Sequence, residues 1–201
     1  MRLEHRCARA QARAWPLLLG ALLLSSCATR TPVAVDPERI RVFDLTGRVN
    51  VRVETKAYPT TGIHWRHEPD SDELWLYSPL GSGVAHMRQD ASGALLVAAD
   101  GKEYRAEDLK ILTRQILGWD LPLDGLQYWV RGLPAPALTA AEQRYDANGR
   151  PEQLRQGGWQ VAYLDWSAAG VTGLPSKVDL SGEGLRVRLV IKEWKVDGPA
   201  K

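Results

Sequence analysis

Phe43-Asp44-Leu45-Thr46-Gly47-Arg48-Val49-Asn50-Val51-Arg52-Val53-Glu54 is the stretch of sequence that decides the fold. Apolar residues and one glycine occupy every odd position, and polar or charged residues occupy every even one. Because successive side chains of a β-strand point to opposite faces, this alternation predicts a long strand with one buried and one solvated face. Half-buried strands of this kind are typical of antiparallel sheets.

Segments with strand patterning recur after this stretch and again toward the end of the chain. The expected strands cover residues 63–66, 73–78, 83–89, 94–98, 143–146, 152–156, 159–163, 178–181 and 185–194. Asp100-Gly101 and Asn148-Gly149 are hairpin signals, because such pairs adopt the tight turns that join antiparallel strands. The chain is therefore expected to be mainly β.

The middle of the chain has helical rather than strand spacing. Residues 106–117 predict an amphipathic helix with an acidic first turn, and Gly118 is positioned to end it. Its apolar side is formed by Leu109, Leu112 and Ile116. A second, shorter helix is expected from Pro122 to the residues before Gly132. Two amphipathic helices can cover an apolar sheet face, which is then either a filled core, favoured by the pattern alone, or a ligand cavity.

The first 26 residues have the three parts of a secretory signal: four arginines, an apolar run over residues 15–24, and small residues at a cleavage site. The run is too short to cross a bilayer as a helix, which takes about 20 apolar residues. Leu24-Ser25-Ser26-Cys27 resembles a bacterial lipoprotein signal. This resemblance implies cleavage before Cys27, a diacylglyceryl thioether on its sulfur and acylation of its amine. The alternatives are an ordinary secretory signal or a buried apolar segment.

Removal of residues 1–26 changes both the charge and the cysteine content. The chain shortens from 201 to 175 residues, and its net charge falls from +2 to −1 because four arginines and one glutamate leave. The basic isoelectric point thus belongs to the signal and is no argument for a nucleic-acid partner. Cys7 also leaves and Cys27 is modified, so no thiol remains for a disulfide, a metal or a nucleophile.

Residues 27–40 are expected to form the lipidated N-terminus and a flexible tether, since they contain Pro32 and Pro37 and no strong periodicity. A flexible chain of this length spans on the order of 20 Å, which would hold the next domain close to a membrane surface. That domain is expected to cover residues 41–197, enough for one hydrophobic core.

The chain lacks the groups that catalysis and metal binding require. His64 and His67 are predicted to point to opposite faces of one strand. His64 and His86 are each predicted to lie on the polar side of their own strand. Gly81-Ser82-Gly83 lacks the spacing and the following helix of a nucleophile elbow. Phosphate-loop, dinucleotide and zinc-protease motifs are absent. We therefore expect no enzyme activity, no metal and no cofactor.

Four motifs follow the lipoprotein signal in a fixed order. They are Pro79-Leu80-Gly81-Ser82; Leu117-Gly118-Trp119-Asp120-Leu121-Pro122-Leu123 with Tyr128-Trp129-Val130-Arg131-Gly132-Leu133-Pro134; Gln156-Gly157-Gly158-Trp159; and Leu174-Pro175 before a strand that ends at Trp194. Each motif is weak by itself, but the ordered set covers nearly all of the mature chain. It resembles the LolB family of outer-membrane lipoprotein receptors.

The resemblance implies a fold and a function. The fold is an incomplete, half-open antiparallel β-barrel with an α-helical lid over an apolar cavity. The function is to accept lipoproteins from the periplasmic carrier LolA by binding their acyl chains, and to insert them into the outer membrane. The implied protein is a monomer on the periplasmic face of that membrane, anchored through Cys27, with carrier, client acyl chains and membrane lipid as partners.

The resemblance also directs attention to particular residues. Candidate cavity residues lie on the apolar sides of the predicted elements: Val49, Val51, Ile63, Trp65, Met87, Leu112, Ile116, Trp129 and Val161. Pro79, Leu80 and Gly81 are expected to form a protruding membrane-insertion loop, although a turn leucine can also fold back onto its sheet. Gly118 and Gly132 are candidate pivots of the lid. Two other functions stay open: a soluble carrier of the same fold, and a structural or adaptor lipoprotein that binds no acyl chains.

Overall fold

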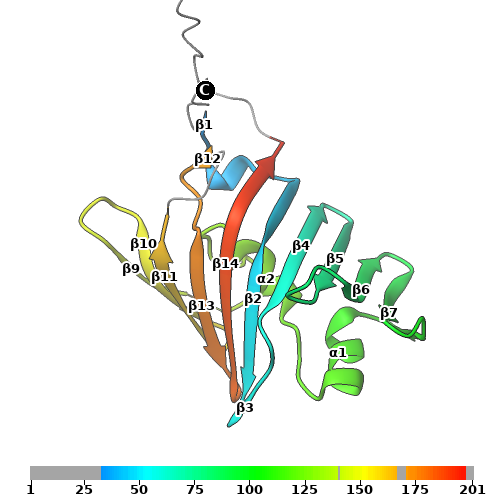
Figure 1. The fold of residues 1–201 in the computed structure, drawn as a ribbon. Helices are drawn as coiled ribbons and strands as arrows, with labels where there is room; N and C mark the ends of the chain where they lie inside the picture. Colours follow the sequence, from blue (N-terminus) through cyan, green and yellow to red (C-terminus); the bar gives the residue numbers. More distant parts are fainter. Residues whose placement is uncertain (1–32, 140, 167–170, 198–201) are drawn as a thin grey trace, which may run out of the picture.

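One antiparallel sheet dominates the computed structural model, which describes residues 33–139, 141–166 and 171–197 (Figure 1). Its twelve strands are β2 (Phe43–Val53), β3 (Lys56–Ala57), β4 (Thr61–Glu68), β5 (Ser71–Tyr77), β6 (Gly83–Asp90), β7 (Gly93–Ala98), β8 (Glu103–Ala106), β9 (Glu142–Tyr145), β10 (Pro151–Gln156), β11 (Trp159–Asp165), β13 (Lys177–Gly182) and β14 (Leu185–Val196). The order is β8-β7-β6-β5-β4-β2-β14-β13-β11-β10-β9, with β3 paired to β2. Because β8 and β9 end this path without pairing with each other, the sheet curls but does not close, as expected of a half-open barrel.

The alternating stretch that opens the domain becomes β2, at the centre of the sheet. It pairs with β14 along its whole length and with β4 along its first half. The predicted inward face is confirmed at Phe43 and Leu45, which are fully buried. Gly47 is required where β14 bulges, because a Cβ atom there would lie 2.2 Å from the Val190 carbonyl oxygen. The bulge turns Trp194 into the core opposite Leu45.

The expected tether boundary at residue 40 differs from the structure. Val33–Ala34 forms β1, which pairs in parallel with β12 (Val171–Thr172), and Pro37–Arg39 forms a short 3-10 helix, η1. Ile40 is buried in the core. Proline content therefore predicted a flexible segment where Val35 and Ile40 in fact pack against the core. The signal segment and Cys27 lie outside the described residues.

Two helices connect β8 to β9 and lie on one side of the sheet, its concave side (Figure 1). α1 (Leu109–Leu117) begins three residues later than predicted, because Glu103–Ala106 pairs with β7 as strand β8. Asp108 caps it by accepting a hydrogen bond from the Ile111 amide, and Gly118 ends it in the left-handed conformation (φ 79°). α2 (Leu123–Trp129) follows after a short linker.

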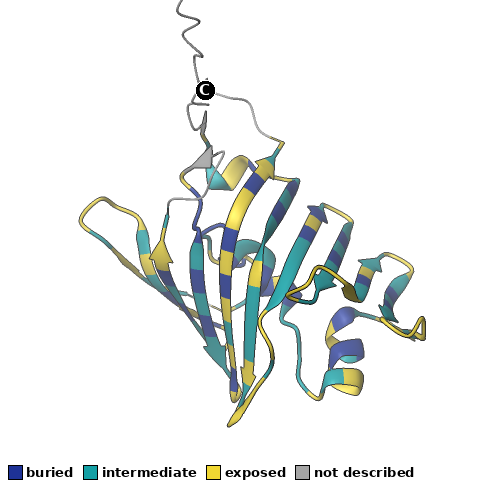
Figure 2. Cartoon of the chain, in the orientation of Figure 1, coloured by how far each residue is buried: buried dark blue, intermediate teal, exposed yellow. Residues whose placement is uncertain are grey.

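The core is shared between the sheet and the helices, and the buried positions alternate along the strands in Figure 2. Its largest fully buried side chains are Trp65, Trp129, Trp194 and Phe43. Trp65 and Trp194 both meet the Phe43 ring edge-on, with centroids 5.0 and 5.4 Å away. The core thus fixes the helices onto the sheet through aromatic side chains from distant parts of the sequence.

Candidate functional site: the helix-covered concave face and the Leu80 turn

The nine predicted cavity residues fall into three groups. Five are buried within the packed core: Trp65, Met87, Leu112, Trp129 and Val161. Val49, Val51 and Ile63 are half-buried and line the lower part of the concave face against this core. Ile116 differs from the prediction. It lies in the last turn of α1 and is 38% exposed, whereas Leu109 and Leu112 on the same helix are buried.

A pocket of about 200 Å³ lies between the helices and the β10–β11 turn. Asp108, Lys110, Leu123, Trp129 and Trp159 are among its lining residues. Ligand pockets are usually about 300–1,000 Å³ and mostly apolar, so this one is small and mixed in character. A large apolar ligand does not fit this pocket unless the helices move away from the sheet or the side chains beneath them rearrange.

Gln156 on β10 holds α2 and the following loop in place. Its Oε1 accepts hydrogen bonds from Trp129 Nε1 (3.1 Å) and the Ala135 amide (2.8 Å). Its Nε2 donates to the carbonyl oxygens of Ala135 (2.9 Å) and Thr139 (3.1 Å). All four hydrogen-bonding positions of a buried amide are therefore used to fix the end of the lid to the sheet.

Arg131, directly after α2, joins the lid to the N-terminal segment. Its guanidinium donates to the carbonyl oxygens of Gln127 (2.9 Å), Pro37 (3.2 Å) and Ile40 (2.6 Å). The side chain is buried, and its burial lowers the pKa of the guanidinium. Sequence reasoning named neither Arg131 nor Gln156 as functional. The available signal was their place within two of the motifs that carry the family resemblance.

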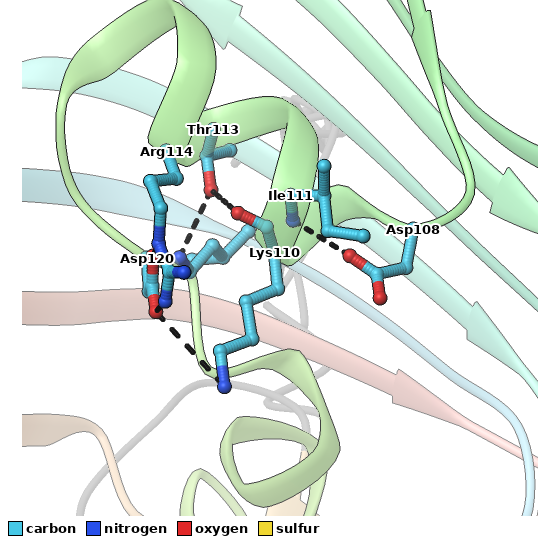
Figure 3. A network of polar contacts seen from close by, with 7 residues as sticks. Asp108, Lys110, Ile111, Thr113, Arg114 and Asp120 are labelled. Atoms are coloured by element: carbon cyan, nitrogen blue, oxygen red, sulfur yellow. Dashed lines mark hydrogen bonds and ion pairs between the residues drawn. The ribbon is translucent and has the colours of Figure 1, made fainter.

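A polar network joins α1 to the linker that leads to α2 (Figure 3). Arg114 Nε donates to Asp120 Oδ1 (2.5 Å), and a second bond joins Arg114 Nη2 to Asp120 Oδ2. The hydrogen bond from Arg114 holds the pKa of the Asp120 carboxyl below its usual range, against the opposing effect of desolvation. Thr113 Oγ1 accepts from the Leu121 amide (3.0 Å) and donates to the Lys110 carbonyl (3.2 Å). These contacts fix the linker that contains Gly118 to α1, and the role of Gly118 as a pivot stays a prediction.

The β5–β6 turn presents an apolar side chain to solvent. Leu80 is 96% exposed, and its neighbours Pro79 and Gly81 are exposed as well. Two backbone hydrogen bonds close the turn, from the Ser78 amide to the Ser82 carbonyl (2.7 Å) and from the Gly81 amide to the Ser78 carbonyl (2.9 Å). Gly81 takes the left-handed conformation (φ 86°) that this turn requires. The turn is thus closed by hydrogen bonds, and Leu80 does not fold back onto the sheet.

The histidines take part in carboxylate pairs. On the outer face, the Trp75 ring stacks between His64 and His86, whose Nε2 atoms lie 2.9 Å from Asp44 Oδ2 and 2.7 Å from Glu73 Oε1. On the inner face, His67 Nδ1 and Trp65 Nε1 both contact Asp72 Oδ1 (2.8 and 2.7 Å). Within the described part of the chain, no group of three or more metal-ligating side chains is assembled. No helix in these same ranges is long and apolar enough to cross a membrane.

An unclosed antiparallel sheet, two helices across its concave face and an exposed leucine turn define the class: a half-barrel with a helical lid. A family model described as "Outer membrane lipoprotein LolB" matches residues 41–194. The chain belongs to the LolB family.

Curated relatives cover nearly the whole chain. The outer-membrane lipoprotein LolB of Chromobacterium violaceum is 38% identical over 183 residues, which is 89% of this chain and 97% of the relative. That of Nitrosomonas europaea is 38% identical over 199 residues, which is 91% of this chain and 92% of the relative. Among solved structures, a DUF1329 family protein from Desulfovibrio piger aligns with a TM-score of 0.51 at 8% identity, over 82% of this chain and 89% of that one. This last likeness concerns the fold alone.

Proposed function

We infer that this protein is an outer-membrane receptor in lipoprotein localisation. The observation that carries the inference is the match of residues 41–194 to the LolB family, over the whole sheet-and-lid unit. A member of this family is a receptor and not an enzyme. The partners are client lipoproteins and a lipoprotein carrier, which for this family is LolA.

The concave face is proposed as the site for client acyl chains. Hiding each methylene from water contributes about 0.8 kcal/mol, so acyl chains in an aqueous compartment need an apolar shield. Val49, Val51 and Ile63 already form a half-buried apolar strip there, next to the buried core. Opening of α1 and α2 would add Met87 of β6 to this strip and would uncover Leu112 on the inner side of α1.

Transfer without an energy source must run downhill. The receptor must therefore bind acyl chains more tightly than the carrier does and less tightly than the membrane. A lid fits this requirement, because the hydrogen bonds of Gln156 and Arg131 and the Arg114–Asp120 pair must be given up when it opens. Their loss offsets part of the gain from acyl burial and leaves the receptor's affinity moderate.

Two further roles are proposed for residues at the membrane. Leu80 would enter the lipid and assist release of the client; burial of one leucine contributes about 1.5–3 kcal/mol, enough to orient a tethered domain but not to anchor it. Cys27 would carry the acyl anchor, since two or more chains are needed for stable attachment.

The packed concave face is the one observation that favours the alternative, an adaptor lipoprotein without acyl-chain binding. Uptake of a fluorescent fatty-acyl probe, displaced by a triacylated peptide, separates the two functions. A receptor binds the probe and loses it when the triacylated peptide competes for the site, whereas a pure adaptor binds neither the probe nor the peptide.

A further inference from the structure

The outer face of the sheet carries a group of arginines near the end where β2 finishes. We name this the arginine patch: Arg48 and Arg52 on β2, Arg186 and Arg188 on β14, with Asp179 on β13 as the acidic residue among them. Arg188 is paired with Asp179 through two hydrogen bonds of 2.7 and 2.6 Å. Within the described residues, Arg48, Arg52 and Arg186 have no ion pair.

Two members of the patch face each other directly. Arg52 and Arg186 are cross-strand partners in the β2–β14 register, and both are exposed. Like charges at directly opposed positions destabilise a sheet. A groove of about 700 Å³ runs over these side chains and also reaches Asn50 and Ser181. An anion that bridges the two guanidinium groups would relieve the repulsion.

The two proposed membrane contacts limit how the domain can lie. Val33 is six positions after Cys27, a distance of at most about 20 Å even for a straight chain. Val33 lies beyond the end where β2 begins, whereas the Leu80 turn lies toward the other end, because Tyr77 is level with Gly62 and Gly62 with Arg48 (Figure 1). If the domain stands on its anchored end, Leu80 is held away from the lipid. If the domain is inverted, the tether must be nearly straight to reach the membrane. A sheet lying along the membrane satisfies both contacts.

Charge selects which face lies against the lipid. The arginine patch has four arginines and one aspartate and is bordered by Glu54 and Glu183, which leaves it net positive, whereas the lid segment 107–124 has four acidic and two basic residues. An anionic headgroup surface attracts the first and repels the second, by about 1 kcal/mol per charge. The patch is also on the opposite face of the sheet from the helices, so it cannot be the surface through which acyl chains enter.

We propose that the arginine patch docks on anionic phospholipid headgroups and holds the domain on its outer face, with the lid turned toward the periplasm. The proposal rests on the proposed function for the Cys27 anchor and the Leu80 turn. It adds a lipid-binding surface and explains how a carrier can reach the lid of a membrane-bound receptor.

The test uses the lipidated protein in vesicles and needs no carrier or client. Because no thiol remains after lipidation of Cys27, Asn50→Cys in the patch and Gln115→Cys on α1 each supply a single labelling position. A fluorophore there is quenched by nitroxide lipids when it lies near the bilayer. In phosphatidylcholine vesicles containing phosphatidylglycerol, we expect strong quenching at position 50 and weak quenching at position 115. In pure phosphatidylcholine or at high salt, the difference disappears.

Charge variants make the test specific. Arg52→Gln with Arg186→Gln should lower the docking equilibrium by roughly thirtyfold, about a factor of five per arginine. Lys102→Gln with Arg150→Gln removes the same charge from exposed positions in the β7–β8 and β9–β10 turns, away from the patch, and should change the docking equilibrium little. The proposal is overturned if the fluorophore is quenched equally at positions 50 and 115, or more strongly on α1. It is also overturned if the two double variants have equal effects on docking, or if the fluorophore at position 50 becomes protected only when a protein carrier is added. None of these results prevents lipoprotein transfer from the carrier, which is measured separately. Conversely, a protein that docks on vesicles but fails to accept lipoproteins would contradict the receptor function and not the docking proposal.

Discussion

Leu80 is a large apolar side chain that a hydrogen-bonded turn presents to solvent, and packing within the domain gives no reason for an apolar residue at this position. Leu80→Glu should leave the fold and acyl-probe binding unchanged, because the side chain touches no core residue. It should slow release of a bound lipoprotein into vesicles by about tenfold or more, in line with loss of roughly 1.5–3 kcal/mol of membrane contact. Release is measured by vesicle flotation after loading.

Leu164→Glu is the matched control for this prediction, since Leu164 on β11 is also an exposed leucine and lies away from the turn. It should release lipoproteins at the normal rate. A normal rate for Leu80→Glu, or an equal defect in Leu164→Glu, would remove Leu80 from the mechanism.

Gln156 satisfies four hydrogen bonds inside the core. Gln156→Ala leaves Trp129 Nε1 and both backbone groups of Ala135 without their partner, and each such buried group costs about 1–3 kcal/mol. We expect the free energy of unfolding to fall by about 3 kcal/mol in urea titrations. Gln153→Ala on the same strand lacks these bonds and should cost less than about 0.5 kcal/mol; equal losses would contradict the assigned role.

Single residues also show where sequence reasoning stops. Inward packing at Phe43 followed from alternation, and a turn at Leu80 followed from its place between proline and glycine, whereas the exposure of Leu80 was implied only by the family resemblance. The exposure of Ile116 could not be predicted in this way. Helical periodicity defines the apolar face of α1, but not how far the sheet extends along that face. The roles of Arg131 and Gln156 depend on carbonyl groups up to 94 positions away in sequence, which no local pattern contains.

The linker between α1 and α2 depends on a charge pair that titrates. Because Arg114 depresses the pKa of Asp120, the pair contributes stability above the unfolded carboxyl pKa of about 3.9, and this contribution is lost as pH falls through the lower folded value. The linker is therefore intact at neutral pH. Asp120→Asn should lower the thermal midpoint at pH 7, and the difference from wild type should shrink below about pH 4.

Asp124→Asn provides the comparison, because Asp124 is an exposed carboxylate on α2 with no ion pair among the described residues. Its midpoint should follow wild type at every pH. A difference for Asp120→Asn that persists unchanged into acid would show that the pair does not hold the linker.

The positions of the strands and helices in the sequence were predicted more completely than the way they pair and pack. Alternation, the two hairpin signals and the capped helix located most strands and both helices near their observed bounds. The pairing of β2 with β14, which joins the first and last strands of the large sheet, depends on contacts across the whole chain. Short elements such as β1, β3 and β12 contain too few residues to show a period. The half-open barrel itself came from the family resemblance.

The molecule as a whole is proposed to act as a tethered domain, with Cys27 as its attachment point. Cys27→Ala removes the sulfur that would carry the diacylglyceryl group, so the domain should leave the outer-membrane fraction of fractionated cells. Mass spectrometry of the wild-type N-terminus should show the added acyl mass on Cys27. An unmodified cysteine, or a variant that remains with the outer membrane, would contradict the anchor.

Receipt of acyl chains is the central claim, and transfer of a triacylated lipoprotein from its purified LolA carrier tests it most directly. The loaded carrier is mixed with this protein, and the client is located by affinity separation of the two. The account predicts that the client moves to this protein without nucleotide and that an acyl-chain competitor blocks the transfer. A client that stays on the carrier, while the domain is folded and docked, would contradict the account.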